Sequence, residues 1–340
     1  MKILIIKLSS FGDIIHCFPV LTRLRALFPD KQIDWLVSDR FADLLIDHKD
    51  LSTLYTLPKN PFQWGNILDK LCEEQYDYAL DLQGLIKTSI IANFIQPKEI
   101  IGLSPARERI AEWFWTKEIE STKILDPNVH VINRSLEIVE EFEKDYRSKQ
   151  GLDLASTKNL PQFNLVEYSE RLPAELINQR FIVFAPESRW QSKNWPIEYW
   201  QSLINELIQN PQFQDYKFVI LGSSPNPFKI IENNKFLNLS GKTSLKDLMG
   251  IVPNAELVIG SDSGIIHLAS AYNVKTLGIY GSTSPMRSGP WNGEYLWLNL
   301  KCSPCHQRQC PLIGDRNLNC LLSIQVNDVL NKIKSILKLI

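Results

Sequence analysis

The sequence predicts an α/β protein built from two doubly wound parallel-sheet domains. Short apolar runs alternate with helical patterns in both halves of the chain, which is typical of parallel sheets. A chain of 340 residues exceeds one ordinary domain, and the polar stretch 148–162 separates the two halves. We therefore expect one domain over residues 1–165 and a second over residues 166–340. Polar candidate residues follow strand ends, so we expect a ligand in a cleft between the carboxyl edges of the two sheets.

The first domain is expected to contain four short apolar strands, at residues 2–7, 32–37, 76–82 and 99–103. A long amphipathic helix over residues 129–146 should close it, because apolar residues recur at helical spacing from Ile132 to Phe142. The second domain repeats the alternation, with strands expected at residues 181–185, 217–221, 236–239, 256–260 and 276–280. Residues 326–339 should form a final helix with one apolar side.

The composition excludes several classes of protein. A net charge of −1 argues against bulk binding to nucleic acid. The apolar run at the N-terminus is too short for a signal peptide, and no apolar run reaches the ~20 residues that a membrane span needs. We therefore expect a cytoplasmic protein that is at most peripheral to a membrane.

The most informative segment joins an apolar run that ends at Gly260 to a helical pattern. Asp262 lies at the strand's end, Ser263 and Gly264 open the helix, and His267 lies on the same helical face as Ser263. Free backbone N–H groups and the helix dipole at such a start suit a phosphate or diphosphate. The alternative is an ordinary capped helix, with Asp262 or Ser263 as the cap and His267 packed on a neighbour.

A second loop of the same character follows the next apolar run and contains Gly281, Thr283 and the pair Gly289-Pro290. Together the two segments resemble the donor-site signature of glycosyltransferase family 9, the bacterial heptosyltransferases: Asp-Ser/Thr-Gly-x-x-His-x-x-Ala-Ala, then Tyr-Gly-x-Thr, then Gly-Pro. Ser270 stands at the first Ala of this signature. The resemblance implies the GT-B fold, in which two Rossmann-like domains face a cleft.

The same resemblance implies an inverting transfer of heptose from ADP-heptose. It assigns acceptor binding to the first domain and donor binding to the second. Donor-binding roles follow for Asp262, Ser263, Gly264, His267, Gly281 and Thr283.

The loop after the first strand carries Ser10-Phe11-Gly12-Asp13, which places Asp13 at the opening of a helix. An inverting sugar transfer needs a base for the proton of the attacking hydroxyl, and a carboxylate within hydrogen-bond reach suffices. The alternative is that Asp13 only caps the helix. Ser-x-Gly-Asp matches the family's opening motif, which implies Asp13 as the catalytic base and Ser10 and Gly12 as acceptor-binding residues.

Two further segments of the first domain carry candidate acceptor ligands. Gln83 and Lys87 follow the third predicted strand, and Arg107 and Arg109 follow the fourth. Cationic side chains pair well with carboxylate and phosphate groups. The alternative is an ordinary solvated charged face. Both segments resemble the heptosyltransferase I group, which attaches the first heptose to Kdo of the lipopolysaccharide inner core.

In the second domain, the segment after the first strand contains Ser188 and Lys193, which can reach a donor diphosphate and offset the charge that builds on the leaving group. No catalytic metal is then needed, if Lys193 and a helix N-terminus neutralise the diphosphate. The chain departs from the family in this domain as well. Glu187 stands where the family commonly has Gly, and residues 222–226 lack the Glu that normally contacts the nucleoside.

Six cysteines in a reducing compartment are not expected to form disulfides, and four of them are close in sequence: Cys302, Cys305, Cys310 and Cys320. This spacing can wrap one tetrahedral metal with thiolates, which predicts a structural zinc or iron within segment 302–320. The alternative is reduced structural thiols. Similar cysteine fingers occur in many family members, including the autotransporter heptosyltransferases, where iron has been proposed.

Together these features predict an inverting, cytoplasmic ADP-heptose heptosyltransferase. The resemblance implies Kdo-lipid A as the acceptor, and we therefore expect peripheral contact with the inner membrane. One alternative is a protein O-heptosyltransferase acting on serines of an autotransporter-type adhesin. A non-catalytic sugar-binding module would bind without turnover. An NAD-dependent dehydrogenase is disfavoured, because the loops after Lys7 and Ala185 lack Gly-x-Gly-x-x-Gly.

Overall fold

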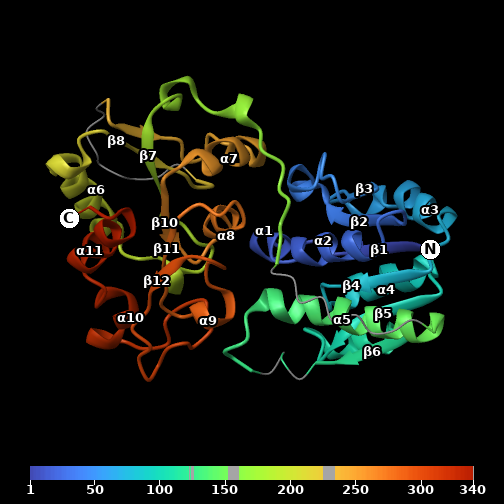
Figure 1. Ribbon diagram of the computed structural model, residues 1–340. Helices are drawn as coiled ribbons and strands as arrows, with labels where there is room; N and C mark the ends of the chain where they lie inside the picture. The colour runs from blue at the N-terminus through green and yellow to red at the C-terminus, as the bar shows by residue number, and fades with distance from the viewer. Residues whose placement is uncertain (122, 124–125, 152–160, 225–233, 340) are drawn as a thin grey trace. The chain divides into compact units, whose positions relative to one another are not determined.

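The computed structural model describes residues 1–340 except 122, 124–125, 152–160, 225–233 and 340. The chain divides into two compact units, Met1–Val166 and Glu167–Ile340, which are described separately below (Figure 1). Most of the polar stretch expected to link them, residues 152–160, lies outside the described residues.

The N-terminal unit contains a parallel six-stranded sheet in the order β3-β2-β1-β4-β5-β6. Its strands are β1 (Lys2–Ile6), β2 (Gln32–Ser38), β3 (Thr53–Leu57), β4 (Tyr78–Asp81), β5 (Glu99–Ser104) and β6 (Lys117–Glu120). The four predicted strands are confirmed. The sequence analysis missed β3 and β6, which are the two edge strands. The strand order reverses between β1 and β4, so the carboxyl end of β1 lies at a topological switch point, where such sheets bind ligands.

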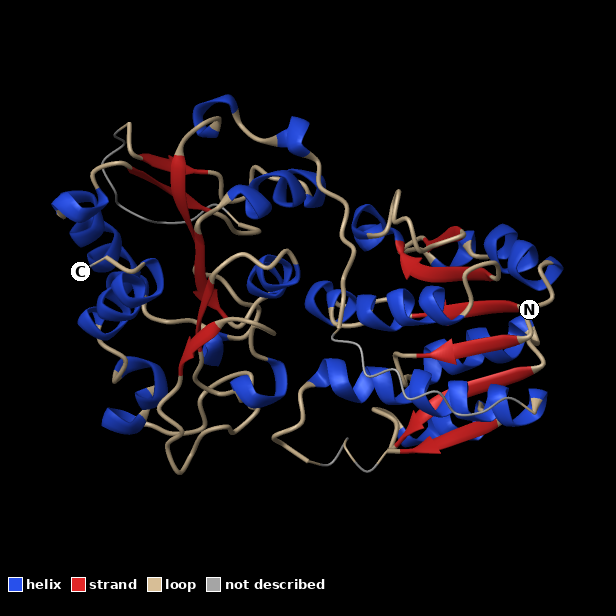
Figure 2. Cartoon of the chain, in the orientation of Figure 1, coloured by secondary structure: helices blue, strands red, loops and turns tan. Residues whose placement is uncertain are grey.

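Helices pack around this sheet (Figure 2). They are α1 (Phe11–Ile15), α2 (Phe18–Leu27), α3 (Gly65–Glu73), α4 (Ile86–Ile95) and α5 (Val131–Gln150), with 3₁₀ turns η1 (Asp39–Leu44), η2 (Pro61–Gln63) and η3 (Arg109–Phe114). The long amphipathic helix predicted at 129–146 is α5. Pro19 lies in the first turn of α2, where its missing N–H breaks no helical hydrogen bond.

The C-terminal unit repeats the architecture with a second parallel sheet in the order β12-β11-β10-β7-β8-β9. Its strands are β7 (Arg180–Ala185), β8 (Tyr216–Ile220), β9 (Phe236–Asn238), β10 (Leu257–Ser261), β11 (Thr276–Ile279) and β12 (Glu294–Leu296). All five predicted strands are confirmed, and only the edge strand β12 was missed. The order reverses between β7 and β10, so the loops after these two strands flank the switch point of this sheet.

The helices of this unit are α6 (Ile197–Gln209), α7 (Leu245–Ile251), α8 (Gly264–Ala271), α9 (Pro285–Ser288), α10 (Asn319–Leu322) and α11 (Val326–Leu337), with 3₁₀ turns η4 (Ser169–Arg171), η5 (Ala174–Leu176), η6 (Gln191–Lys193), η7 (Pro211–Phe213), η8 (Val252–Asn254) and η9 (Gly314–Arg316). Before α6, the buried Trp195 packs edge-to-face on Trp200 and donates a hydrogen bond to the Ile324 carbonyl, which fixes the start of α6 against the chain before α11.

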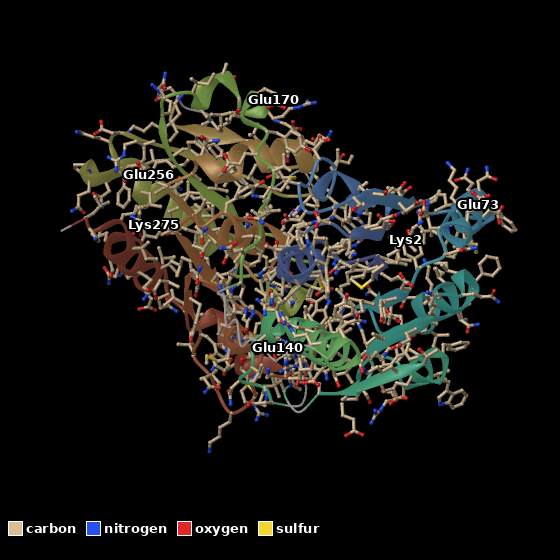
Figure 3. The ribbon with its side chains drawn as sticks, turned by 45° about the vertical axis from the view of Figure 1, so that its right-hand side comes forward. Lys2, Glu73, Glu140, Glu170, Glu256 and Lys275 are labelled. Atoms are coloured by element: carbon tan, nitrogen blue, oxygen red, sulfur yellow. The ribbon has the colours of Figure 1, made fainter. Side chains whose placement is uncertain are left out.

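The exposed residues Glu73, Glu140 and Glu170 lie on α3, α5 and η4 (Figure 3). Among the helices of the described residues, none combines the length and the apolar character that crossing a bilayer requires.

Candidate active site

In the N-terminal unit, Asp13 lies in the first turn of α1, just after the carboxyl end of β1. Its Oδ2 accepts hydrogen bonds from the Ser10 backbone N–H (3.1 Å) and from the Ser10 hydroxyl (2.7 Å). Within the described residues, Oδ1 has no hydrogen-bond partner. Asp13 therefore does help to cap α1, as the alternative interpretation expects, but capping engages only one of its two oxygens.

The environment of Asp13 favours its ionised form. Burial raises the pKa of the carboxyl, but the positive charge of Lys7, the two hydrogen bonds from Ser10 and the charge of Arg107 together hold it below its usual value. Lys7 is itself buried and donates to the Leu82 carbonyl at 2.8 Å, so its position is fixed. Asp13 is accordingly a carboxylate at neutral pH, ready to accept a proton.

A buried carboxylate that the sequence analysis missed organises the neighbouring loop. Asp81 ends β4, and its Oδ1 accepts from the backbone N–H groups of Gln83 (3.0 Å) and Gly84 (3.1 Å). The side-chain carbonyl of Gln83 in turn accepts from the Ser9 N–H at 3.2 Å. Gln83 thus joins the β4 loop to the loop that carries Ser10. An Asp at a strand end, two residues before Gln-Gly, was the available signal.

The three predicted cationic acceptor residues have different surroundings. The Lys87 ammonium lies 4.6 Å from the centre of the Trp64 ring, and the exposed Arg109 pairs with Glu112 at 3.0 Å. Arg107 is the one whose charge lowers the pKa of Asp13. Gly84 allows the backbone at Arg107 to lie close to the loop after β4. It has a positive φ of 62°, and a side chain there would meet the Arg107 backbone at 3.2 Å.

In the C-terminal unit, the Asp262 carboxylate connects three segments. It accepts from the Lys193 ammonium of η6 (2.7 Å) and from the Thr283 hydroxyl after β11 (2.7 Å), and His267 of α8 lies 3.5 Å away. Burial raises the pKa of Asp262, but the hydrogen bond from His267 and the charge of Lys193 hold it far below its usual range. Asp262 therefore orients and neutralises Lys193, which is a more specific arrangement than the simple ligand contact that the sequence suggested.

The start of α8 lies beside this group. Ser263 is the N-cap residue in extended conformation, and Gly264 is the first helical residue. Across the switch point, the Ser188 hydroxyl donates to the Asp262 carbonyl at 2.9 Å, and the Ser188 N–H donates to the Asn194 side chain at 2.7 Å. The loops after β7 and β10 are thus joined at the N-terminus of a buried helix, which is a suitable site for a phosphate group.

Gly281 has a packing role. A side chain at this position would lie 2.6 Å from Leu321, so the close approach of α10 to the loop after β11 requires glycine. Gly281 was grouped with the donor ligands from the sequence, and the structure supplies this additional reason for its small size.

Several residues near Lys193 were not found from the sequence. Burial lowers the pKa of His306, and the positive charges of Arg287 and Lys193 lower it further. His306 also belongs to the segment 306–309, which lines a pocket of about 580 Å³ together with Trp190. The Lys193 ammonium lies 4.5 Å from the Trp190 ring centre. No spacing in the sequence connects residue 306 to residue 193, because only the fold brings them together.

The cysteine-rich segment supports the donor loops directly. The Ser192 N–H donates to the Arg308 carbonyl at 3.2 Å, and the Ser192 hydroxyl donates to that of Ser282 at 2.9 Å. The His306 N–H donates to the Ser282 carbonyl at 2.8 Å. Residues 306–308 therefore hold together the loop that carries Lys193 and the loop that carries Thr283.

The predicted tetrahedral thiolate shell is not formed in this structure. Burial and the charges of Cys302, Cys305 and Cys310 raise the pKa of Cys320 to about 11, so the four thiols are neighbours. However, Cys302 is exposed, and the Cys310 sulfur accepts from the Leu318 N–H at 3.3 Å. Over the described part of the chain, no three His, Cys, Asp or Glu side chains are arranged to hold a metal ion. The four thiols are therefore near one another but do not point at a common position where a metal ion could bind.

Comparison with known proteins agrees with the two-sheet architecture. The chain is 24% identical over 336 residues to lipopolysaccharide heptosyltransferase 1 of Pseudomonas aeruginosa, covering 94% of this chain and 90% of that protein. The structure of the Escherichia coli ADP-heptose lipopolysaccharide heptosyltransferase II superposes with a TM-score of 0.76 at 20% identity, covering 99% of this chain and 98% of that one. The iron-containing dodecameric glycosyltransferase TibC from enterotoxigenic E. coli superposes with a TM-score of 0.59 at 15% identity, covering 99% and 76%.

These structures show that the fold is of the GT-B type, as the sequence predicted. The family model for glycosyltransferase family 9 (heptosyltransferase) matches residues 64–314, which include the second half of the N-terminal sheet and nearly all of the C-terminal site. The chain is therefore a transferase and belongs to glycosyltransferase family 9, the heptosyltransferases.

Proposed function

We propose that the protein transfers heptose from ADP-heptose to Kdo of the lipopolysaccharide inner core, with inversion at the anomeric carbon. The observation that carries this proposal is the pair of complementary sites at the two switch points. An ionised carboxylate with one oxygen unengaged follows β1, and a partly buried, oriented lysine lies beside the start of α8. The lipopolysaccharide heptosyltransferases among the relatives support the choice of sugar and pathway.

The proposed chemistry follows from these two groups. As the acceptor hydroxyl attacks the anomeric carbon of the heptose, its proton passes to Oδ1 of Asp13, and the bond from that carbon to the diphosphate breaks. The electron pair leaves with ADP. Lys193 and the N-terminal N–H groups of α8 offset the charge that develops on the diphosphate. The protein's own cationic groups thereby take the part that a catalytic metal plays elsewhere.

The direct test is incubation with ADP-heptose and truncated Kdo-lipid A, followed by mass spectrometry of the lipid. We expect one added heptose per acceptor. A serine-rich adhesin fragment tested in parallel represents the protein O-heptosyltransferase alternative. Heptose on the peptide, with none on the lipid, would reject the Kdo acceptor. Binding of ADP-heptose with no transfer to either compound would reject both acceptors.

Arg107 is expected to contribute most among the three cationic acceptor candidates, because its charge reaches Asp13 while Arg109 is paired with Glu112. Arg107→Gln should raise the KM for Kdo-lipid A by about tenfold or more and leave the Kd for ADP unchanged. Arg109→Gln is the matched control and should change the KM less than threefold. Initial rates at varied acceptor concentration measure both. Equal effects of the two variants would contradict the assignment.

A lipid-linked acceptor requires the enzyme to reach a membrane surface, and the N-terminal unit has a suitable face. Exposed apolar side chains lie on α4 and η3, which pack on each other: Ile90, Phe94, Ile110 and Trp113. We expect sedimentation with vesicles of anionic phospholipid, reduced severalfold in the double variant Phe94→Ser/Trp113→Ser. Ile313→Ser, at an equally exposed apolar residue of the other unit, should sediment like the wild type. Undiminished sedimentation of the double variant would exclude this face.

We propose that the cysteine segment binds one structural zinc or iron, although the four thiols do not converge in this structure and would have to move together around the ion. Thiolates are the donors that these metals take, and TibC, which has a similar fold, is an iron-containing protein. Elemental analysis should find about one metal ion per chain, lost together with some thermal stability in Cys305→Ser and retained in Cys72→Ser. Metal-free protein after anaerobic purification without chelators would leave these residues as reduced structural thiols.

A further inference from the structure

A carboxylate that the proposed mechanism does not use reaches across the carboxyl edge of the C-terminal sheet. Glu187 follows β7, yet its Oε2 accepts hydrogen bonds in the loop after β8: from the N–H groups of Ser223 (2.9 Å) and Ser224 (3.3 Å) and from the Ser223 hydroxyl (3.2 Å). Over the described residues, every hydrogen bond to this carboxylate goes to Oε2. Oε1 is therefore available as an acceptor on a side chain whose position is fixed.

The backbone after β8 is shaped to admit this side chain. A Cβ at Gly222 would lie 3.0 Å from Oε2 of Glu187 and 3.2 Å from its carboxyl carbon. These atoms are closer than nearly all real Cβ contacts, so a larger residue at 222 would push the carboxylate away. Glycine here allows the Glu187 carboxylate to lie against the end of β8, although residues 222–226 contain no carboxylate of their own.

The position of this carboxylate matches the needs of a nucleotide. In doubly wound sheets, a nucleotide lies across the loops at the carboxyl edge beside the switch point, with its phosphates at a helix N-terminus and its ribose hydroxyls donating to a carboxylate from another strand end. Glu187 is adjacent in sequence to Ser188, which is bonded to the Asp262 loop. Ribose is bonded directly to the first phosphate of a nucleoside diphosphate, so a ribose-binding group should lie about one sugar from the phosphate-binding groups.

We propose that Glu187 is the ribose-binding residue of the donor site, with Oε1 accepting a hydrogen bond from a ribose hydroxyl. An ionised carboxylate is purely an acceptor, and vicinal hydroxyls are donors, so the two are complementary. The inference rests on the proposed function in requiring a nucleoside diphosphate donor. It adds the residue that recognises the ribose of the nucleoside. This residue comes from the loop after β7, whereas the family's Glu normally comes from the segment that corresponds to residues 222–226.

Isothermal titration calorimetry with ADP, 2′-deoxy-ADP and 3′-deoxy-ADP tests the proposal. The wild-type chain should bind ADP about 10- to 100-fold more tightly than at least one of the deoxy analogues, because a charge-assisted hydrogen bond is lost. Glu187→Gln should weaken ADP binding by a similar factor and remove the preference. Glu206→Gln, at an exposed acid on α6, is the matched control and should retain both affinity and preference.

The outcomes separate the inference from the function on which it rests. A Glu187→Gln variant that loses affinity equally for all three nucleotides would show that Glu187 only supports the loop, and would overturn the inference. So would a wild-type chain that binds ADP without any preference over the deoxy analogues, a result that needs no folded variant. If the wild type binds neither ADP nor ADP-heptose, the proposed donor fails, and the ribose assignment fails with it.

Discussion

Asp13→Asn should lower kcat by about 10²- to 10⁴-fold while the Kd for ADP changes less than twofold. The amide is nearly isosteric and can still accept from Ser10, so helix α1 should persist, but the amide cannot take up the proton of the acceptor hydroxyl. Single-turnover kinetics and calorimetry on the same preparation measure the two quantities. Asp39→Asn, at an exposed acid of η1 in the same unit, should keep wild-type turnover. Turnover within tenfold of wild type in Asp13→Asn would remove Asp13 from the mechanism.

The pH profile provides a second readout of the same base. Because the pKa of Asp13 is held below its usual value of 3.8, the acidic limb of kcat/KM due to this group should lie below about pH 4. Lys7→Met removes the largest lowering influence on that pKa, so the limb should move to higher pH. A limb that stays in place in Lys7→Met would show that another group controls it.

The central parts of both sheets were predictable from the sequence, whereas some of their edges were not. Central strands are buried on both faces and read as continuous apolar runs, as at residues 4–6 and 258–260. The missed strands β3, β6 and β12 are edge strands that pair on one side only, and their sequences are mixed. Their strand conformation depends on a neighbour rather than on a local pattern.

The candidate functional residues at the switch points were likewise predictable, but their hydrogen-bond and ion-pair partners were not. Motifs placed Asp262 correctly at the end of β10 and Asp13 correctly at the opening of the helix that follows β1. They did not reveal that Asp262 accepts from Lys193 and Thr283, which come from other loops. Arg107 and Arg109 have the same type and neighbouring positions, and only the pairing of Arg109 with Glu112 distinguishes them. Such differences depend on contacts between segments that are distant in sequence.

The ion pair between the partly buried Lys193 and the buried Asp262 should give the other large effect. Lys193→Ala should weaken ADP binding by about 10- to 100-fold, because the diphosphate loses a charge-assisted contact. Asp262→Asn should weaken binding as well, since the lysine loses the carboxylate that orients it. It should also lower the free energy of unfolding by about 1–3 kcal/mol, because a partly buried cation is left without its counter-ion. Lys332→Met, which breaks the exposed pair with Glu294, should cost less than about 1 kcal/mol and leave ADP binding intact.

The dependence of unfolding on pH identifies the same pair independently. Asp262 has a folded pKa far below that of the unfolded chain, so its stabilising contribution is complete above about pH 4, the unfolded value. As the pH falls below that value toward the folded pKa, protons bind preferentially to the unfolded chain and the contribution is lost. Urea unfolding between pH 3 and pH 7 should therefore show a smaller loss of stability at low pH in Asp262→Asn than in the wild type. Identical pH dependence in the two proteins, together with unchanged calorimetric affinity for ADP in both pair variants, would place the donor elsewhere on the chain.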